Sequence, residues 1–240
     1  MPSLQAILFD IDDTLFSTTE FARRARRNAV EAMIERGLKL DAEVVLRELD
    51  EVISEFGSNY AHHYEKLLQR LPSEALAGLN PSLVISAGIV SYHDTKFQEL
   101  KPFEDVAPLL TDLREAGLRL GVVTHGWTVK QAEKLVRLRL LRYFDPLAVI
   151  ISEQVGISKP NPKLYAKALR ALDLPAGEVL YVGDNPTHDI APPQSLGMPA
   201  VWIKRAAKHG LEGTGIQPDH IVEDFSGLRT VLREVYGIAV

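Results

Sequence analysis

Three acidic residues follow a short apolar segment near the start of the chain. Residues 4–9 are rich in Ile, Leu and Phe, and Asp10, Asp12 and Asp13 come directly after them. So brief an apolar run suits a strand that is buried on both faces of a parallel sheet. Ligands of such sheets bind at the carboxyl ends of the strands, where Asp10 and Asp12 would lie. Two carboxylates this close repel each other unless a divalent cation or an ammonium group lies beside them.

Two other interpretations of these acids are a calcium-binding loop and a surface turn. An EF-hand loop has acids or amides at its first, third and fifth positions and glycine at the sixth. Here the fifth position is Thr14 and the sixth is Leu15, which argues against the calcium loop. A surface turn with incidental acids is the simpler alternative, and the rest of the chain has to be weighed against it.

The composition excludes several classes of protein. With 240 residues, the chain can form one large domain or a core domain with an insert. Its net charge of −5 and its scattered Lys and Arg argue against nucleic acid or a membrane surface as the main partner. The absence of cysteine excludes disulfides, thiolate metal sites and cysteine nucleophiles. Because the sequence shows no signal peptide and no apolar run of membrane-spanning length, we expect a cytoplasmic protein.

The chain changes character twice along its length. From residue 17 to 100 the apolar residues recur with helical periodicity, which predicts helices at about 17–37, 41–57, 58–71 and 81–100 with no strand between them. From residue 101 onward, helices alternate with short apolar strands. The expected strands lie at 118–124, 148–152, 179–183, 200–204 and 220–223, and the helices at 105–116, 127–141, 162–172, 187–196 and from 225. The pattern predicts a parallel sheet covered by helices on both faces, with an all-helical insert.

Several of these strands end in residues suited to binding a phosphate group. One strand ends in Thr124, and the backbone N–H groups of His125 and Gly126 follow at the start of a helix, where an anion is favoured. Lys159 lies between rigid turn residues in a later loop, and Asp184 follows another strand. Each feature is weak alone, since a threonine before glycine is often a helix cap and a loop lysine is usually solvated.

Taken together, these residues resemble the motifs of the haloacid dehalogenase superfamily over nearly the whole chain. The matching residues, in chain order, are Asp10, Asp12 and Thr14 of the first motif, Thr124 of the second, Lys159 of the third, and Gly183, Asp184 and Asp189 of the fourth. The resemblance implies an α/β fold with a Rossmann-like core, formed by residues 1–16 and 101–240. It also implies that residues 17–100 are a helical cap domain of the C1 type, which closes over the active site.

The resemblance also implies a role for each residue of the first motif. Asp10 would be the nucleophile that forms an aspartyl-phosphate, which divides one difficult displacement into two easier steps. Asp12 would give a proton to the leaving alcohol and then take one from water. Mg²⁺ would be held by the carboxylates of Asp10 and Asp184 and by the backbone carbonyl of Asp12, because oxygen ligands suit a hard cation.

The other motifs would bind the phosphoryl group. Thr124, the His125 amide with Gly126, and Lys159 would hold its oxygens as charge shifts in the transition state. Asp189 and Thr14 would contact the residues that bind the metal and the substrate, and not the substrate itself.

The sequence departs from the family pattern at two places. His125 stands where the second motif usually has Asn or Asp, although the backbone N–H at that position is kept. After Asp189, Pro192 and Pro193 remove two N–H donors from the helix that normally begins there, so that helix is expected to start late.

An acid at the position of Asp12 favours a phosphatase, since dehalogenases and phosphonate hydrolases of the superfamily lack it. The prediction is a Mg²⁺-dependent phosphohydrolase of a small phosphorylated metabolite, present as a monomer or homodimer, with no nucleic-acid or membrane partner. The alternatives are a sugar-phosphate mutase of the β-phosphoglucomutase kind, a haloacid dehalogenase, and a non-catalytic protein that binds a phosphometabolite.

The expected cap offers further candidates, each with a simpler interpretation. Arg23, Arg24, Arg26 and Arg27 form either a solvated helix face or a surface that attracts an anionic substrate. Phe16 lines the site or packs in the core. The remaining candidates for contact with the leaving group, for all of which a surface position is the simpler interpretation, are Asn59, Tyr60, His62, His63 and His93.

Overall fold

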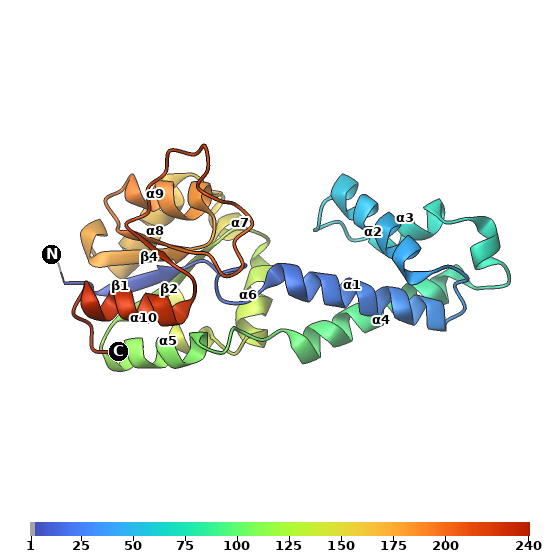
Figure 1. Ribbon diagram of the computed structural model, residues 1–240, viewed down its shortest axis with the longest axis horizontal. Coiled ribbons are helices and arrows are strands. Elements are labelled where there is room, and N and C mark those ends of the chain that lie inside the picture. The colour runs from blue at the N-terminus through green and yellow to red at the C-terminus, as the bar shows by residue number, and fades with distance from the viewer. Residues whose placement is uncertain (1–2) are drawn as a thin grey trace. The chain divides into compact units, whose positions relative to one another are not determined.

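The computed structural model describes residues 3–240, which divide into two compact units (Figure 1). One unit contains residues 3–18 together with Lys101–Val240, and the other is Thr19–Leu100. Across the described residues, the helices are too short or too polar to cross a membrane.

The first unit is built on a sheet of six parallel strands in the order β3-β2-β1-β4-β5-β6. The strands are β1 (Ala6–Phe9), β2 (Arg119–Thr124), β3 (Val149–Ile151), β4 (Val179–Gly183), β5 (Ala200–Ile203) and β6 (His220–Val222). The order reverses direction between β1 and β4, and ligands of open parallel sheets bind beside such a reversal. The first motif follows β1 and the fourth follows β4, so both lie at this position.

Helices cover both faces of this sheet, which confirms the predicted α/β fold. Successive side chains of a strand point to opposite faces. On one face Ala6 and Leu8 pack in a cluster with Leu164 of α8 (Pro162–Leu172), and on the other Phe9 stacks on Phe225 of α10 (Phe225–Glu234) with 5.9 Å between ring centroids. The helices are α5 (Val106–Glu115), α6 (Thr128–Arg137), α7 (Ser152–Val155), α8 (Pro162–Leu172), α9 (Ala191–Gln194) and α10 (Phe225–Glu234). Short 3-10 turns lie at Leu141–Tyr143, Pro146–Ala148 and Ala176–Glu178.

The second unit consists of helices, with no strand among its residues. The helices are α1 (Thr18–Glu35), α2 (Ala42–Phe56), α3 (His63–Arg70), the 3-10 turn Ser73–Leu76 and α4 (Pro81–Glu99). The Asp41 carboxylate accepts from the backbone N–H of Glu43 and so caps α2, and Asn80 caps α4 in the same way. The apolar faces of the helices meet in one core that contains Met33, Val45 and Leu67.

Two predicted helices are longer than the observed ones. The helix expected from residue 58 begins only at His63, because Gly57 turns the chain with φ 79° and Tyr60 folds back to stack on Phe56 at 4.8 Å. The helix expected to reach residue 141 ends at Arg137, because Arg139 is in the left-handed conformation with φ 58°. The N–H of the following Leu140 bonds to the carbonyl of Leu135, which closes the helix end.

The helix expected at 187–196 is also different. Pro186–Ile190 form a wide π turn, and only Ala191–Gln194 are α-helical. Pro192 and Pro193 cannot donate to the carbonyls four residues earlier, so a regular helix cannot begin before them. The His188 carbonyl accepts a hydrogen bond from the Tyr165 hydroxyl instead. The other predicted helices and strands lie within two residues of their expected bounds.

Candidate active site

The strand-end acids of the first and fourth motifs meet beside the reversal in strand order. Asp10 follows β1, and its backbone N–H bonds to the carbonyl of Val182 in β4 at 2.9 Å. Asp184 follows β4, and Asp189 lies in the π turn. One carboxylate oxygen from each of Asp10, Asp184 and Asp189 lies within 4.8 Å of the others, and all three residues are buried. These three acids form a carboxylate cluster that could hold a metal ion.

Lys159 inserts its ammonium group into the carboxylate cluster. Its Nζ lies 2.6 Å from Asp10 Oδ1, 2.6 Å from Asp189 Oδ1 and 3.0 Å from the Tyr181 hydroxyl. The Lys159 side chain is 3% exposed, so these contacts replace almost all of its hydration. Burial alone would lower the pKa of Lys159, but the charges of Asp10 and Asp189 outweigh it and raise that pKa. Lys159 therefore stays positively charged.

One lysine does not balance three buried carboxylates. Burial raises the pKa of the Asp10 carboxyl to about 7, although the Lys159 charge opposes that rise. Burial, with the charges of Asp189 and Asp10, raises the pKa of Asp184 to about 8. Within residues 3–240 no hydrogen-bond donor or ion-pair partner contacts the Asp184 carboxylate. The three carboxylates offer only oxygen ligands, and one ammonium group does not neutralise their charge. This fits a hard divalent cation.

The backbone at the end of β4 allows Asp189 to pack directly against Gly183 and Asn185. The N–H of Asn185 donates to Asp189 Oδ2 at 3.0 Å, and the N–H of Asp189 donates to the Asn185 carbonyl. A Cβ atom on Gly183 would lie 2.4 Å from the Cβ of Asp189, which no side chain can tolerate. Gly183 is therefore required for this packing. Despite the altered helix after it, Asp189 is buried and contacts Lys159.

The Asp12 carboxylate has partners of its own, which the sequence did not indicate. Lys134 Nζ lies 2.6 Å from Asp12 Oδ1 and 2.7 Å from Oδ2. The Gln131 amide donates to Oδ2 at 3.0 Å, and the Thr18 hydroxyl donates to Oδ1 at 2.8 Å. Burial would raise the pKa of Asp12, but the charge of Lys134 and these hydrogen bonds outweigh it and lower that pKa. Gln131 and Lys134 lie within a predicted helix, but its periodicity did not tell which face meets the first motif.

The threonines of the first two motifs carry unpaired hydroxyl groups. Thr124 is 1% exposed at the end of β2 and Thr14 is fully buried. In the described part of the chain, neither hydroxyl has a hydrogen-bond partner. An unpaired buried hydroxyl costs free energy and is rare, and the Thr124 hydroxyl at the strand end is available to donate to a bound group.

The residues after Thr124 differ from the expectation. The N–H of Gly126 donates to the Ser152 hydroxyl at 2.9 Å, so it is engaged by the protein. The exposed His125 ring lies with Nδ1 2.7 Å from the Ser158 hydroxyl, which links the second motif to the loop that carries Lys159.

Asp13, which follows Asp12 in the first motif, also pairs with a lysine. Asp13 is 4% exposed and has φ 57°. Its Oδ1 accepts from the backbone N–H of Thr18, and its Oδ2 pairs with Lys208 at 2.6 Å. Asp13 thus starts α1 and holds the loop after β5.

Most candidates from the expected cap lie in the helical unit. Arg24, Arg26 and Arg27 pair with Glu99, Asp50 and Glu43, and Arg23 is exposed. The helical-unit candidates Tyr60, His62 and His63 pack edge to face, and His93 lies against Tyr92. Phe16 is instead buried in the α/β unit, with Lys134 Nζ 5.9 Å from its ring centroid.

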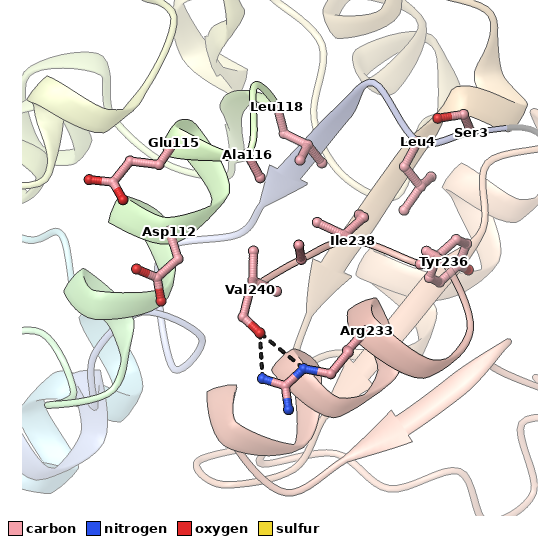
Figure 2. Close-up of a pocket in the computed structure, with 12 residues that line it drawn as sticks. Ser3, Leu4, Asp112, Glu115, Ala116, Leu118, Arg233, Tyr236, Ile238 and Val240 are labelled. Carbon is pink, nitrogen blue, oxygen red and sulfur yellow. Dashed lines mark hydrogen bonds between the residues drawn. The ribbon is translucent and has the colours of Figure 1, made fainter.

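The α/β unit also has a pocket of about 1060 Å³, shown in Figure 2, whose lining includes none of the carboxylate-cluster residues. Leu4 and Leu118, which line it, precede β1 and β2, so the pocket lies at the amino ends of the strands. Ile238 and Val240 of the C-terminal segment close one side, where Arg233 donates to the Val240 carbonyl. None of the predicted site residues lines it.

Comparison with known proteins settles the family. Residues 7–203 match the model of the haloacid dehalogenase-like hydrolases, which is most of the chain. The chain belongs to this family. The match includes every residue of the four motifs.

Relatives with named activities indicate the class of enzyme within this family. The glyceraldehyde 3-phosphate phosphatase of Methanopyrus kandleri is 44% identical over 236 residues, which cover 97% of this chain and 98% of that protein. The protein of the same name from Pyrococcus abyssi is 46% identical over 201 residues, covering 84% of this chain and 82% of that one. A phosphatase structure from Thermococcus onnurineus covers 95% of this chain and 98% of its own, with a TM-score of 0.64 and 26% identity. The chain is a phosphatase, and the predicted enzyme class is confirmed.

Proposed function

We propose that this phosphatase hydrolyses glyceraldehyde 3-phosphate, or a phosphate monoester of similar size, with Mg²⁺ and through an aspartyl-phosphate. The substrate assignment rests on the 44% identity to the Methanopyrus kandleri protein over 97% of this chain. That similarity includes Thr19–Leu100, the region corresponding to the cap that sets the substrate in this family. A cytoplasmic location and a monomeric or homodimeric state remain predictions.

In the first step, the Asp10 carboxylate attacks phosphorus and the bond to the ester oxygen breaks. Lys159 holds Asp10 Oδ1 at 2.6 Å, so the nucleophile is oriented before substrate arrives. Lys134 lowers the pKa of Asp12 in the free protein, so Asp12 takes up a proton before this step; it then gives that proton to the departing oxygen, which leaves as an alcohol. The buried Thr124 hydroxyl, which has no partner among residues 3–240, supports donation to a phosphoryl oxygen.

In the second step, the Asp12 carboxylate takes a proton from water as that water attacks the phosphorus of the aspartyl-phosphate. The bond between phosphorus and the Asp10 oxygen breaks, which returns Asp10 as a carboxylate and releases inorganic phosphate. The same Asp12 thus carries one proton in each direction during a cycle. Asp189 and Tyr181 hold Lys159 in place during both steps.

The metal would be held by the carboxylates of Asp10 and Asp184 and by the backbone carbonyl of Asp12. When bound, Mg²⁺ supplies the positive charge that three buried carboxylates and a phosphoryl group require. Asp189 lies in the same cluster, but its two oxygens are taken by Lys159 and by the N–H of Asn185. Its role is therefore to orient Lys159.

Phosphate release from a panel of small phosphate esters tests the proposal. Glyceraldehyde 3-phosphate should give the highest kcat/KM, phosphoserine and pyrophosphate should be poor, and β-glucose 1-phosphate should yield no glucose 6-phosphate. EDTA should abolish phosphate release and added Mg²⁺ should restore it. Full activity in EDTA would contradict the metal, and a preference of about tenfold or more for phosphoserine would contradict the substrate.

A further inference from the structure

The ammonium group of Lys134 contacts Asp12, the proposed acid and base of the reaction. Lys134 contacts both oxygens of Asp12, at 2.6 and 2.7 Å. Its side chain is 21% exposed and that of Asp12 is 29% exposed, so water reaches the pair only in part. A cation that contacts both oxygens restricts rotation of the carboxylate, which a single contact does not.

Gln131 ties the same carboxylate to the second motif. It lies three residues before Lys134 on α6, so the two side chains leave the helix on one face. Its amide nitrogen lies 3.0 Å from Asp12 Oδ2 and 2.6 Å from the His125 carbonyl. A Cβ atom at position 126 would lie 2.6 Å from that nitrogen, so Gly126 is needed for this approach. Helix α6 therefore aligns Asp12 with the loop that follows Thr124.

The contacts fill the acceptor positions of the Asp12 carboxylate. An ionised carboxylate has about four lone-pair sites. Lys134 and Thr18 contact Oδ1, and Lys134 and Gln131 contact Oδ2. To take a proton from water, one of these contacts must open. Lys134 contacts both oxygens, so it can release one and keep the carboxylate in place through the other.

The two site lysines therefore have different tasks. Lys159 joins Asp10 to Asp189 and is almost fully buried. Among the described residues, the ammonium group of Lys134 has Asp12 alone as its hydrogen-bond and ion-pair partner.

We propose that Lys134 is a positioning residue of the phosphatase reaction, which fixes the Asp12 carboxylate beside the reacting atoms and does not bind the phosphoryl group. The proposal rests on the role proposed above for Asp12. It predicts that Lys134 acts on turnover only through Asp12.

A double-mutant cycle with Asp12→Asn tests this. Lys134→Met keeps the length of the stem and removes the charge, and it should lower kcat on glyceraldehyde 3-phosphate about 10- to 100-fold, because a displaced catalytic group loses rate steeply. KM should change less than about threefold, since the phosphoryl contacts are intact. In the Asp12→Asn background, Lys134→Met should cost less than about twofold. Lys134→Arg, which can also contact both oxygens, should recover most of the loss.

Lys130→Met is the matched control. Lys130 lies one turn earlier on the same helix, is exposed and stacks over Trp127, and its loss should leave kcat unchanged. Equal losses from Lys134→Met in both backgrounds, or a raised KM with unchanged kcat, would overturn the positioning role and indicate substrate contact. If Asp12→Asn itself kept full activity, the proposed function of Asp12 would fail, and the role of Lys134 with it. Circular dichroism of each variant separates these outcomes from loss of fold.

Discussion

Charged residues in the α/β unit and in the helical unit differ in how much water reaches them. The side chains of Lys159 and Asp189 are 3% and 2% exposed, whereas those of Arg27 and Glu43 are 40% and 65% exposed. Both pairs have short distances, 2.6 and 2.8 Å. An exposed ion pair gains little because water solvates its ions equally well, while a buried one depends on its partners entirely.

The two regions also differ in charge balance. Each arginine pair of α1 joins one cation to one acid. In the carboxylate cluster, Lys159 faces Asp10, Asp184 and Asp189. We therefore expect the uneven, buried charges to carry function and the balanced, exposed ones not to.

The largest expected effect is loss of all turnover in Asp10→Asn. The amide cannot attack phosphorus and is a poor metal ligand, so every substrate should fail. Phosphate release from p-nitrophenyl phosphate and from glyceraldehyde 3-phosphate measures this. Asp173→Asn, at an exposed helix end in the left-handed conformation that asparagine tolerates, is the control and should keep full activity. Residual turnover near the wild-type rate would remove Asp10 from the chemistry.

Asp12→Asn should lose less, and the loss should depend on the leaving group. Proton transfer is worth on the order of 10²- to 10⁴-fold, so alkyl esters should slow by that amount. Nitrophenolate departs without a proton, so p-nitrophenyl phosphate should give a burst of nitrophenol and then a slow steady rate, because the phosphoenzyme lacks its base. Intact mass should detect the phosphoprotein. Equal loss on both ester types, with neither burst nor phosphoprotein, would contradict the role of Asp12.

Lys159→Met should be the most destabilising change of a lysine. It leaves Asp10 and Asp189 buried without their cation, which should lower the unfolding free energy by about 3–5 kcal/mol. Urea denaturation of the metal-free protein near pH 8 measures it. Lys163→Met, exposed on the first turn of α8, should change stability by less than about 0.5 kcal/mol. If the two variants were equally stable, the buried cluster would not depend on its lysine.

A smaller effect concerns pH. The folded pKa values of Asp10 and Asp184, about 7 and about 8, lie above the ordinary 3.8, so the folded protein binds these protons more tightly than the unfolded chain. The stability they contribute is complete below about pH 4 and is lost as the pH rises through 7 and 8. The lowered pKa of Asp12 acts only below about pH 4, outside this window. The metal-free protein should therefore melt at a lower temperature at about pH 8.5 than at about pH 5.5.

The control for this pH effect is Asp184→Asn, which removes one of the two groups and should reduce the fall in melting temperature. Mg²⁺ should raise the melting temperature of the wild type more at the higher pH, because the metal binds the ionised carboxylates. A melting temperature that rises between these two pH values would show that the carboxylates are not strained by burial.

The smallest expected effect is that of Arg27→Gln. Its pair with Glu43 is exposed, so neither the melting temperature nor kcat should change measurably. A raised KM with an unchanged melting temperature would instead support the alternative in which the arginines of α1 attract an anionic substrate. Kinetics at low and high salt would then separate steering from direct contact, because salt screens the former.

The sequence by itself determined which residues stand at strand ends. The apolar run before Asp10 and the one before Asp184 predicted two strands of a parallel sheet, and such strands end at one edge, so the acids had to lie near each other. Pro192 and Pro193 likewise predicted an irregular helix start, because a missing N–H is a local property of the residue. Motif spacing then indicated Thr124 and Lys159 as members of the same site.

Only the tertiary structure decided which cation faces which carboxylate. Lys134 and Lys130 are both lysines of one helix, yet Lys134 contacts Asp12 and Lys130 lies over Trp127. Which part of α6 reaches Asp12 depends on how the helix packs, with Gln131 and Leu135 buried, and this packing does not follow from periodicity within the helix. Burial is likewise a property of the assembled core: the raised pKa values of Asp10 and Asp184 arise from atoms brought together across several strands and loops.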